Sequence, residues 1–243
     1  MTPLSVYIGF DKREPEAYDV TAFSIQRHAS APVDIFPLKI DRLRAQGLYT
    51  RPTSTRDGRL WDDFSDAPMS TEFAITRFLV PHLATTPWAV FCDCDFLWRH
   101  DIFKLINDVD DSKALWCVQH DYRPAEATKM DNQAQTQYSR KNWSSMMVWN
   151  VPHPANKKLT LEMVNTLPGR DLHRFCWLAD GDIGNVSPTW NWLEGHSDPA
   201  INPNVIHYTR GGPWFDNWQH VAFAQEWLDE RAMMKKQGYR AAS

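Results

Sequence analysis

Short apolar runs that end at an acidic residue recur along the chain. Residues 4–10 are mostly apolar and stop at Asp11, and residues 88–92 are apolar and stop at Asp93. Apolar runs of this length, bounded by polar residues or Pro, are typical of buried strands. Residues 33–38 predict another strand, and the segment between residues 10 and 33 has helical spacing. This opening predicts two parallel strands joined by a right-handed crossover helix.

Apolar residues at helical spacing predict several helices. The first begins near Pro15, because Pro suits the first turn of a helix. A second would be capped by Ser70 or Thr71 and would kink or end at Pro81. Further helices are expected at residues 102–106, 157–167, 172–179 and 218–236, and further strands at residues 114–118, 145–151 and 204–208.

Two segments lack such periodicity. Residues 47–68 are rich in Gly, Pro, Ser, Thr and Asp, which predicts a long loop that flanks or closes over a site. Residues 121–141 are polar and irregular. Because helices and strands alternate without a repeat or linker, we expect an α/β fold in one domain over residues 1–243. Its central sheet would be Rossmann-like and mostly parallel, flanked by helices, with a C-terminal helix at about 218–236.

The composition suits such a domain and argues against some partners. A chain of 243 residues with 43% hydrophobic residues can bury a substantial core. Lys and Arg number 26 against 30 Asp and Glu, so the broad basic face that nucleic acid requires is not expected. The start of the chain lacks the features of a signal peptide, and no segment approaches the roughly 20 apolar residues that span a bilayer. We therefore expect a cytoplasmic protein without a transmembrane segment.

Two aspartates follow the apolar run at residues 88–92. In open α/β sheets, ligands collect beyond the carboxyl ends of the strands. Residues two apart in extended backbone project to the same side, so Asp93 and Asp95 can approach one point. Adjacent carboxylates repel each other unless a cation lies between them, which favours a divalent metal. The alternative is that the two aspartates cap a helix or face water.

A second candidate ligand stands at the end of a later predicted strand. His207 is followed closely by Gly211, Gly212 and Pro213, which predict a turn. An imidazole nitrogen together with carboxylate oxygens suits Mn²⁺ and similar ions, and leaves positions open for phosphate oxygens. A single histidine at a strand end is also commonly a structural residue held by hydrogen bonds.

Taken together and in order, these segments resemble the glycogenin-like retaining glycosyltransferases, glycosyltransferase family eight, which have the GT-A fold. The resemblance covers roughly residues 4–218. It rests on the first strand ending in Asp11, the segment 71–81 that carries Arg77, the Phe-Cys-Asp-Cys-Asp motif at 91–95 with its continuation at 101–105, and the segment 206–214 that carries His207 and closes with Pro-Trp.

The resemblance implies a site for a nucleotide sugar. Asp93, Asp95 and His207 would hold a divalent ion, Mn²⁺ or Mg²⁺, against the diphosphate of the donor, a UDP-hexose. Arg77 would join the metal in stabilising the negative charge that develops on the departing diphosphate. Asp11 belongs to the strand that resembles the family's uridine-binding strand. An arginine on a helix also commonly makes only a surface ion pair.

The chain departs from the family at three places. Trp143-Ser144-Ser145 stands where the family usually has Asn-Ser-Gly. Gly212 replaces the family's Lys before Pro-Trp, so Arg210 would take over a phosphate contact. The family's later acidic segment is matched only loosely by residues 180–184, in which Asp182 would orient the acceptor or the donor sugar. A turn or helix-capping role for Asp182 is the alternative.

The expected activity is metal-dependent transfer of a hexose from a UDP-sugar to a saccharide or glycoconjugate acceptor, with retention of anomeric configuration. Trp190, Trp192, Trp214 and Trp218 would offer flat faces to an acceptor sugar or belong to the core. The basic end of the C-terminal helix at residues 235–236 would allow contact with an anionic membrane that carries the acceptor.

Two alternatives from other classes stay open. One is a haloacid-dehalogenase-type phosphatase, in which Asp93 and Asp95 would act as nucleophile and acid and a loop with Gly181 and Asp182 would hold Mg²⁺. The other is a noncatalytic module of the same fold that binds a nucleotide sugar or a metal.

Overall fold

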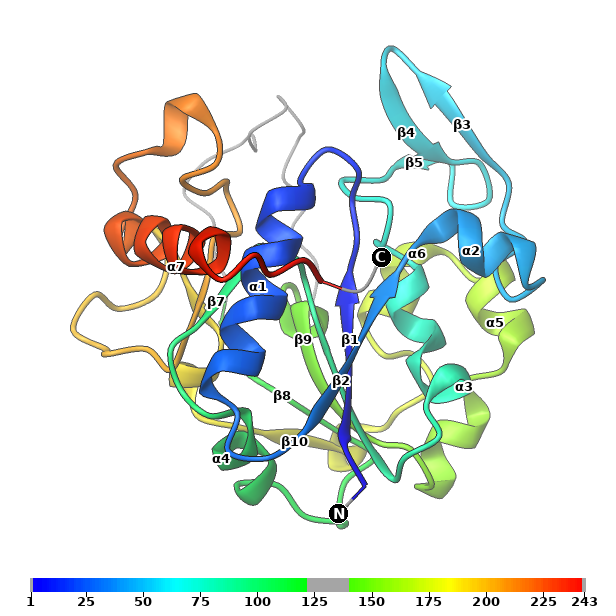
Figure 1. Cartoon of the computed structure of the whole chain (residues 1–243). Coiled ribbons are helices and arrows are strands. Elements are labelled where there is room, and N and C mark those ends of the chain that lie inside the picture. Colours follow the sequence, from blue (N-terminus) through cyan, green and yellow to red (C-terminus); the bar gives the residue numbers. More distant parts are fainter. Residues whose placement is uncertain (1, 122–139, 242–243) are drawn as a thin grey trace.

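The computed structural model describes residues 2–121 and 140–241, and its core is a six-stranded mixed sheet. Figure 1 shows how the helices are arranged around it. The strand order is β10-β8-β9-β6-β1-β2, and β9 alone runs antiparallel to its two neighbours. The expected α/β fold with a mostly parallel central sheet flanked by helices is therefore confirmed. The strands are β1 (Leu4–Gly9), β2 (Val33–Leu38), β6 (Trp88–Cys92), β8 (Leu115–Cys117), β9 (Met146–Asn150) and β10 (Ile183–Asn185).

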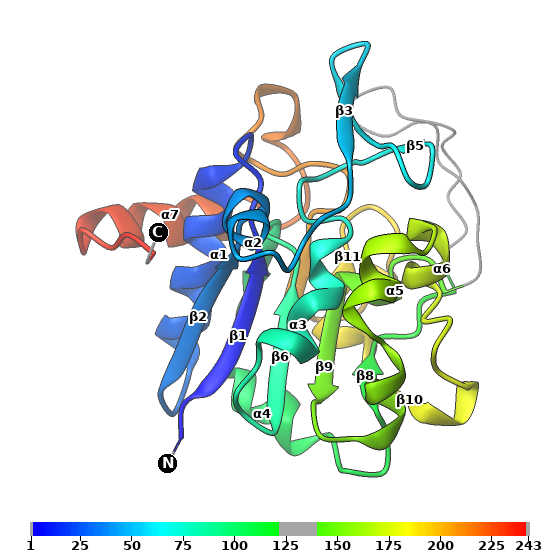
Figure 2. The same cartoon turned by 90° about the vertical axis from the view of Figure 1, so that its right-hand side faces the viewer.

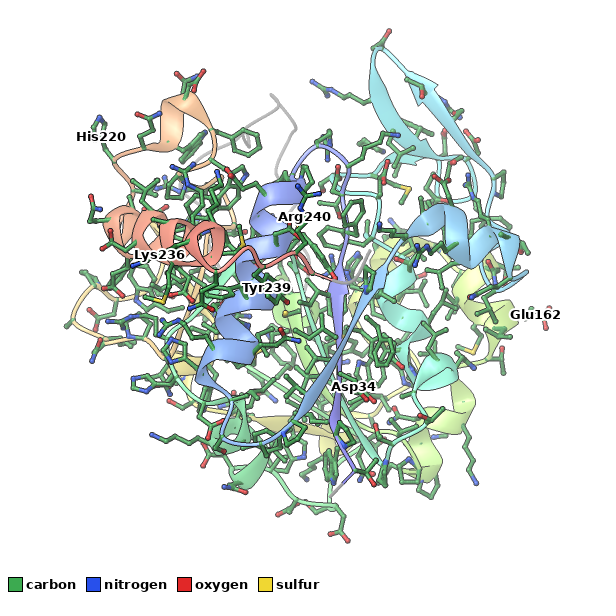
Figure 3. All side chains as sticks on the ribbon, viewed as in Figure 1. Asp34, Glu162, His220, Lys236, Tyr239 and Arg240 are labelled. Atoms are coloured by element: carbon green, nitrogen blue, oxygen red, sulfur yellow. The ribbon has the colours of Figure 1, made fainter. Side chains whose placement is uncertain are left out.

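Helices cover both faces of this sheet. On one face lie α1 (Pro15–His28) and α7 (Ala224–Lys236), and on the other lie α3 (Val80–Leu83), α5 (Leu161–Thr166) and α6 (Gly169–His173) (Figure 2). All six residues of β1 are buried, because its neighbours are β2 and β6 and helices cover it. The edge strand β2 instead alternates half-buried and exposed positions, with Asp34 facing outward (Figure 3). The remaining helices are α2 (Ile40–Ala45) and α4 (Ile102–Asn107).

A small second sheet lies on the α1 face. It consists of β7 (Phe96–Trp98), β11 (Trp192–Leu193) and β12 (Val205–His207). Thr21 of α1 ties β7 to this helix, because its hydroxyl lies 2.6 Å from the carbonyl oxygens of both Cys94 and Phe96. Strand β12 runs antiparallel to β7 with His207 opposite Phe96. This pairing carries a late segment of the chain to the residue that directly follows Asp95.

The expectation of a long loop at residues 47–68 was wrong. This segment forms β3 (Thr53–Arg56), β4 (Arg59–Asp62) and β5 (Ala67–Pro68), a three-stranded antiparallel sheet that projects from the body of the molecule (Figure 1). Asp57 and Gly58 connect β3 to β4 with φ angles of 51° and 75°. Two positive φ angles in a two-residue turn, with Asp-Gly as its sequence, are typical of a hairpin.

Several helices differ from their predicted bounds. The helix expected around residues 70–81 is reduced to a 3-10 segment, η1 (Thr76–Leu79), that runs into α3. Pro81 lies in the first turn of α3 and so begins a helix instead of ending one. Helix α7 begins at Ala224, six residues later than expected, and α5 and α6 are shorter than predicted. Most of the irregular segment expected at 121–141 lies outside the described residues.

The end of α7 is tied to α1. Lys235 Nζ lies 2.6 Å from Glu16 Oε1, so one of the two lysines considered for a membrane contact is paired within the molecule. Across residues 2–121 and 140–241, no helix has both the length and the apolar character needed to cross a bilayer.

A buried ion pair anchors the hairpin to the body. Arg51 and Asp62 are 1% and 2% exposed, and the guanidinium forms two hydrogen bonds with the Asp62 carboxylate. Arg51 Nη1 also donates to the carbonyls of Val164 at 3.0 Å and Leu167 at 2.7 Å, at the end of α5. Burial opposes ionisation, but the hydrogen bonds from Arg51 and Ser65 lower the pKa of Asp62 below its ordinary value.

We predict that Arg51→Met lowers the free energy of unfolding by about 3–5 kcal/mol, because it leaves a buried carboxylate without its cation. Urea unfolding at pH 7 measures the change. Arg56→Met is the matched control, since Arg56 pairs with Asp63 and Asp66 at the exposed side of the same hairpin and should matter little.

The same pair gives a pH dependence. Because the folded pKa of Asp62 is depressed, its contribution to stability is present above its unfolded pKa, near 4, and is lost as the pH falls through the folded pKa. An Arg51→Met variant with wild-type stability would contradict this account of the anchor.

Candidate functional site

The acidic pair lies between two strands of different sheets. Strand β6 ends at Cys92, β7 begins at Phe96, and Asp93 and Asp95 both line a pocket at this junction. Cys94 between them is 1% exposed and packs into the core. Two backbone hydrogen bonds fix the segment: Asp93 N donates to Ser145 O and Tyr208 N donates to Asp95 O, each at 3.0 Å. The two carboxylates therefore share one pocket, as their spacing predicted.

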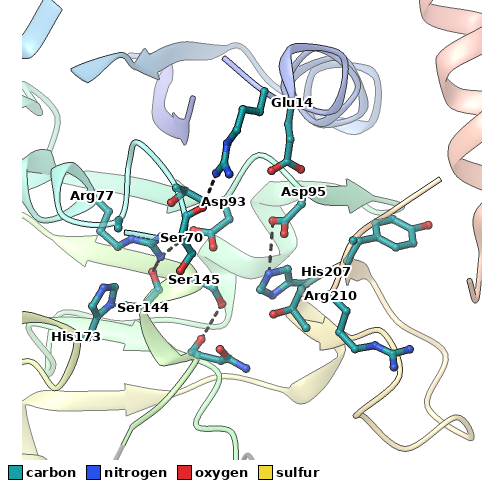
Figure 4. A pocket seen from close by; sticks show the side chains of 17 residues that line it. Glu14, Ser70, Arg77, Asp93, Asp95, Ser144, Ser145, His173, His207 and Arg210 are labelled. Atoms are coloured by element: carbon teal, nitrogen blue, oxygen red, sulfur yellow. Dashed lines mark hydrogen bonds and ion pairs between the residues drawn. The ribbon is translucent and has the colours of Figure 1, made fainter. Parts of the chain in front are cut away.

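His207 reaches the same pocket from β12. Its ring stacks on Phe96, with ring centroids 4.4 Å apart, and is 2% exposed. His207 Nε2 lies 3.5 Å from Asp95 Oδ1, and the two side chains point toward each other (Figure 4). One ligand atom each from Asp93, Asp95 and His207 lies within 4.8 Å of the other two. The structure thus brings together the three residues predicted to bind a metal.

These three side chains fit a divalent cation. Two carboxylate oxygens and one imidazole nitrogen form a ligand set that Mn²⁺ accepts, and Mg²⁺ accepts the oxygens. Three protein ligands leave further positions for oxygens of a bound ligand. The pocket beside them is lined by other polar groups, among them Arg77, Ser144 and His173.

Arg77 lies against Asp93. Its Nη1 atom is 2.8 Å from Asp93 Oδ1 and donates to Ser144 O at 2.8 Å. The guanidinium carbon lies 5.3 Å and 4.9 Å from the ring centroids of Phe73 and Phe91. Arg77 is 5% exposed, so it is not the surface arginine of the alternative interpretation. It places a fixed positive charge at the edge of the pocket.

Asp11 is fully buried but does not line this pocket. Its carboxylate accepts hydrogen bonds from the backbone N, Nε and Nη2 of Arg13 and from Glu72 N. Burial alone would raise the pKa of Asp11, but the hydrogen bonds from Arg13 hold it below its ordinary value. Asp11 lines a neighbouring hollow against the β3–β4 hairpin, and Arg13 lines both hollows.

Arg210 lines the pocket near His207, but its guanidinium points toward Glu194. The Nη2 atom lies 2.9 Å from Glu194 Oε2, and Glu194 is buried. The guanidinium carbon lies 5.4 Å from the ring centroid of Trp218. Arg210 therefore brings positive charge to this side of the site in the company of a buried carboxylate.

The structure does not bring Asp182 to the pocket. Asp182 precedes β10, which is parallel to β6, whereas Asp93 follows β6, so the two aspartates lie at opposite edges of the sheet. Its carboxylate accepts a hydrogen bond from Ala179 N at 3.1 Å, a local turn contact. The phosphatase alternative required the loop with Gly181 and Asp182 to lie beside Asp93 and Asp95, and this separation argues against it.

Two further groups line the pocket: Glu14, which the sequence did not single out, and His173, for which we expected only a structural role. Glu14, just before α1, is buried, and its Oε2 atom accepts a hydrogen bond from Trp214 Nε1 at 3.0 Å. Its carboxyl group lies on the Asp95 side of the pocket (Figure 4). At the other end, His173 Nδ1 lies 2.7 Å from Ser144 Oγ. Neither Glu14 nor His173 belongs to a motif, so only the fold reveals them.

None of the four tryptophans considered, all of them described residues, lines the pocket. Trp190 and Trp192, considered for an acceptor platform, are 2% and 3% exposed and belong to the two hydrophobic clusters. Trp214 is partly buried and packs against Tyr208 and Trp227. Trp190 and Trp192 therefore serve packing, as the second interpretation held.

Comparison with solved structures gives the class of fold. The chain superposes on the bifunctional glycosyltransferase WbbM with a TM-score of 0.63 and 17% identity, over 95% of this chain and 50% of WbbM, so it spans about half of that protein. It matches the galactosyltransferase LgtC with a TM-score of 0.57 and 11% identity, over 95% of this chain and 96% of LgtC. Mouse xyloside xylosyltransferase 1 gives a TM-score of 0.54 and 11% identity, over 86% and 98%. The fold is that of GT-A-like glycosyltransferases.

Sequence comparison gives the family. No family model matches the chain. The chain is 46% identical over 246 residues to Protein CDI of Arabidopsis thaliana, a match that covers 99% of this chain and 90% of that protein. This chain belongs to the Protein CDI family.

Glu14 gives the site a testable pH dependence. Burial, and then the nearby carboxylates of Asp95 and Asp11, raise the pKa of Glu14 to about 8. Between its unfolded pKa, near 4.5, and about 8, the folded protein binds one more proton than the unfolded chain, so stability falls as the pH rises. For metal-free protein, we predict that Glu14→Gln removes a slope of about 1.4 kcal/mol per pH unit in this range.

Urea unfolding in EDTA at pH 5, 6, 7 and 8 measures the slope. Glu162→Gln is the control, because Glu162 is exposed on α5 (Figure 3) and does not line the pocket. Parallel stability profiles for wild type and Glu14→Gln would show that Glu14 ionises normally.

Proposed function

We propose that the chain is a metal-dependent glycosyltransferase. It transfers a hexose from a nucleotide sugar, a UDP-hexose, to a saccharide or glycoconjugate acceptor, in the manner of the glycogenin-like enzymes of glycosyltransferase family eight. The observation that carries the proposal is the convergence of Asp93, Asp95 and His207 in the pocket of a fold shared with glycosyltransferases. Retention of anomeric configuration rests on the family resemblance alone.

Asp93, Asp95 and His207 are the proposed ligands of Mn²⁺ or Mg²⁺. A divalent ion at this position supplies charge stabilisation for the diphosphate leaving group, an effect worth several kcal/mol. Arg77 is proposed to act with it. Its ion pair with Asp93 holds that carboxylate in place and keeps a cation at the edge where negative charge develops.

The two ends of the pocket suggest how the donor lies. Ser144 and His173 are proposed to contact the hexose hydroxyls, because a hydroxyl and an imidazole supply both donors and acceptors. Arg210, at the opposite end, is proposed to stand in for the lysine that precedes Pro-Trp in the family.

Because Asp11 already binds Arg13 and Glu72, its proposed contact with the nucleotide would be indirect, through Arg13. Asp182 has no part in this arrangement.

We predict that Asp95→Ala raises the dissociation constant for UDP in the presence of Mn²⁺ by at least about 100-fold, because losing a ligand costs more than losing an outer partner of a ligand. Isothermal titration with and without Mn²⁺ measures this. Asp34→Ala is the control, since Asp34 is exposed on β2 and does not line the pocket. Unchanged UDP affinity in folded Asp95→Ala would refute the site.

The choice between transferase and binding module depends on turnover. A transferase slowly hydrolyses one UDP-sugar in the presence of Mn²⁺, and a thermal-shift screen of nucleotide sugars with and without the metal identifies which one to test. A noncatalytic module would bind without hydrolysis. A phosphatase would instead release phosphate from a small ester with Mg²⁺.

A further inference from the structure

A chain of hydrogen bonds lies behind His207, on the side of the ring away from Asp95. His207 Nδ1 lies 3.1 Å from Asn191 Oδ1. Asn191 Nδ2 donates to Ser145 Oγ at 2.9 Å, and Ser145 Oγ donates to the carbonyl oxygen of Asn142 at 2.7 Å. Asn191 is 0% exposed and Ser145 is 4% exposed. The far nitrogen of a candidate metal ligand is therefore held by a buried network.

The network has only one consistent direction. The Ser145 hydroxyl has a single proton, and the Asn142 carbonyl can only accept it. Ser145 Oγ must therefore accept from Asn191, which it can do only from the amide nitrogen. This places the Asn191 oxygen against the ring, and because an amide oxygen can only accept, His207 Nδ1 must carry a proton.

We propose that Asn191 is a positioning residue that fixes His207 as the Nδ1–H tautomer and aims its Nε2 lone pair at the cation site. This inference rests on the proposed function, since it assumes that a divalent cation binds there. A neutral imidazole of this tautomer presents its Nε2 lone pair to Asp95 Oδ1 at 3.5 Å, an arrangement that a shared cation stabilises. Ligand histidines in proteins almost always donate their other nitrogen to such an outer partner.

Ser145 links this network to a second ligand. Its hydroxyl orients Asn191, while its carbonyl oxygen accepts a hydrogen bond from Asp93 N at 3.0 Å. One residue therefore helps to position both His207 and Asp93. Ser145 belongs to the Trp-Ser-Ser triplet that departs from the family pattern, so the departure supplies a hydroxyl that this network uses.

The decisive comparison is between two substitutions of Asn191. Asn191→Leu keeps the branched shape and the number of side-chain heavy atoms but removes the acceptor, whereas Asn191→Asp keeps an oxygen that accepts from Nδ1. We expect Asn191→Leu to weaken Mn²⁺ binding by about 10- to 100-fold and Asn191→Asp to remain within a few-fold of wild type. Electron paramagnetic resonance of free Mn²⁺, without nucleotide, measures the dissociation constants.

Asn156→Leu is the matched control. Asn156 is equally buried, at 3% exposed, and its Nδ2 donates to the carbonyls of Ala114 and Asn150, away from the pocket. It should lose stability without losing Mn²⁺ affinity. Wild-type Mn²⁺ affinity in folded Asn191→Leu would overturn the proposal, as would equal losses in Asn191→Leu and Asn156→Leu.

A second measurement needs no metal. Nitrogen-15 NMR of the ring of His207 in metal-free wild-type protein, at a pH where the ring is neutral, should show the proton on Nδ1, and a proton on Nε2 would overturn the proposal. If wild type fails to bind Mn²⁺, the proposed function fails, while the tautomer still decides the role of Asn191. If Asn191→Leu fails to fold, the wild-type spectrum and Asn191→Asp decide it.

Discussion

The pairing of β12 with β7 is the constraint on which the candidate site depends. The two strands come from segments about a hundred residues apart, and their register sets His207 opposite Phe96, directly after Asp95. A slip of one residue would turn the imidazole to the other face of the sheet. The packing of α1 on β7 and the stacking of His207 on Phe96 fix this register. The geometry of the candidate metal site is thus a product of strand pairing and core packing together.

Charge is distributed unevenly around the pocket. Asp93 has a buried cation beside it in Arg77, whereas Glu14 has no cation in hydrogen-bond contact among the residues described and is bound instead by the indole of Trp214. The carboxyl groups of Asp93 and Glu14 line the same pocket but thus have different electrostatic environments. Arg77 supplies a counter-charge to Asp93, whereas burial raises the pKa of Glu14 and favours its neutral form. A divalent ion bound between Asp93 and Asp95 would lower the electrostatic repulsion between the carboxylates of Asp95 and Glu14.

The sequence comparison and the structure comparison establish different things about this chain. The relative at 46% identity defines the family, and the solved glycosyltransferases define the class of fold. The buried network of Asn142, Ser145 and Asn191 explains why the amide of Asn191 occupies a fully buried position, where an unpaired amide would cost several kcal/mol.

The sequence by itself determined the elements whose signals are local. The pattern of apolar and polar residues predicted β1, α1, β2 and β6, and the Asp-x-Asp spacing predicted two carboxylates in one pocket. Both signals depend only on residues that are close together in the sequence. The hairpin at 53–62 was also encoded locally, in Asp57-Gly58, and was missed because composition outweighed the turn signal. Only the tertiary structure decided that Asp182 lies at the far edge of the sheet, that Asp11 lies outside the pocket, and that Glu14 and Asn191 stand at the site. Those positions depend on strand order and on contacts between distant segments, which no local pattern of residues records.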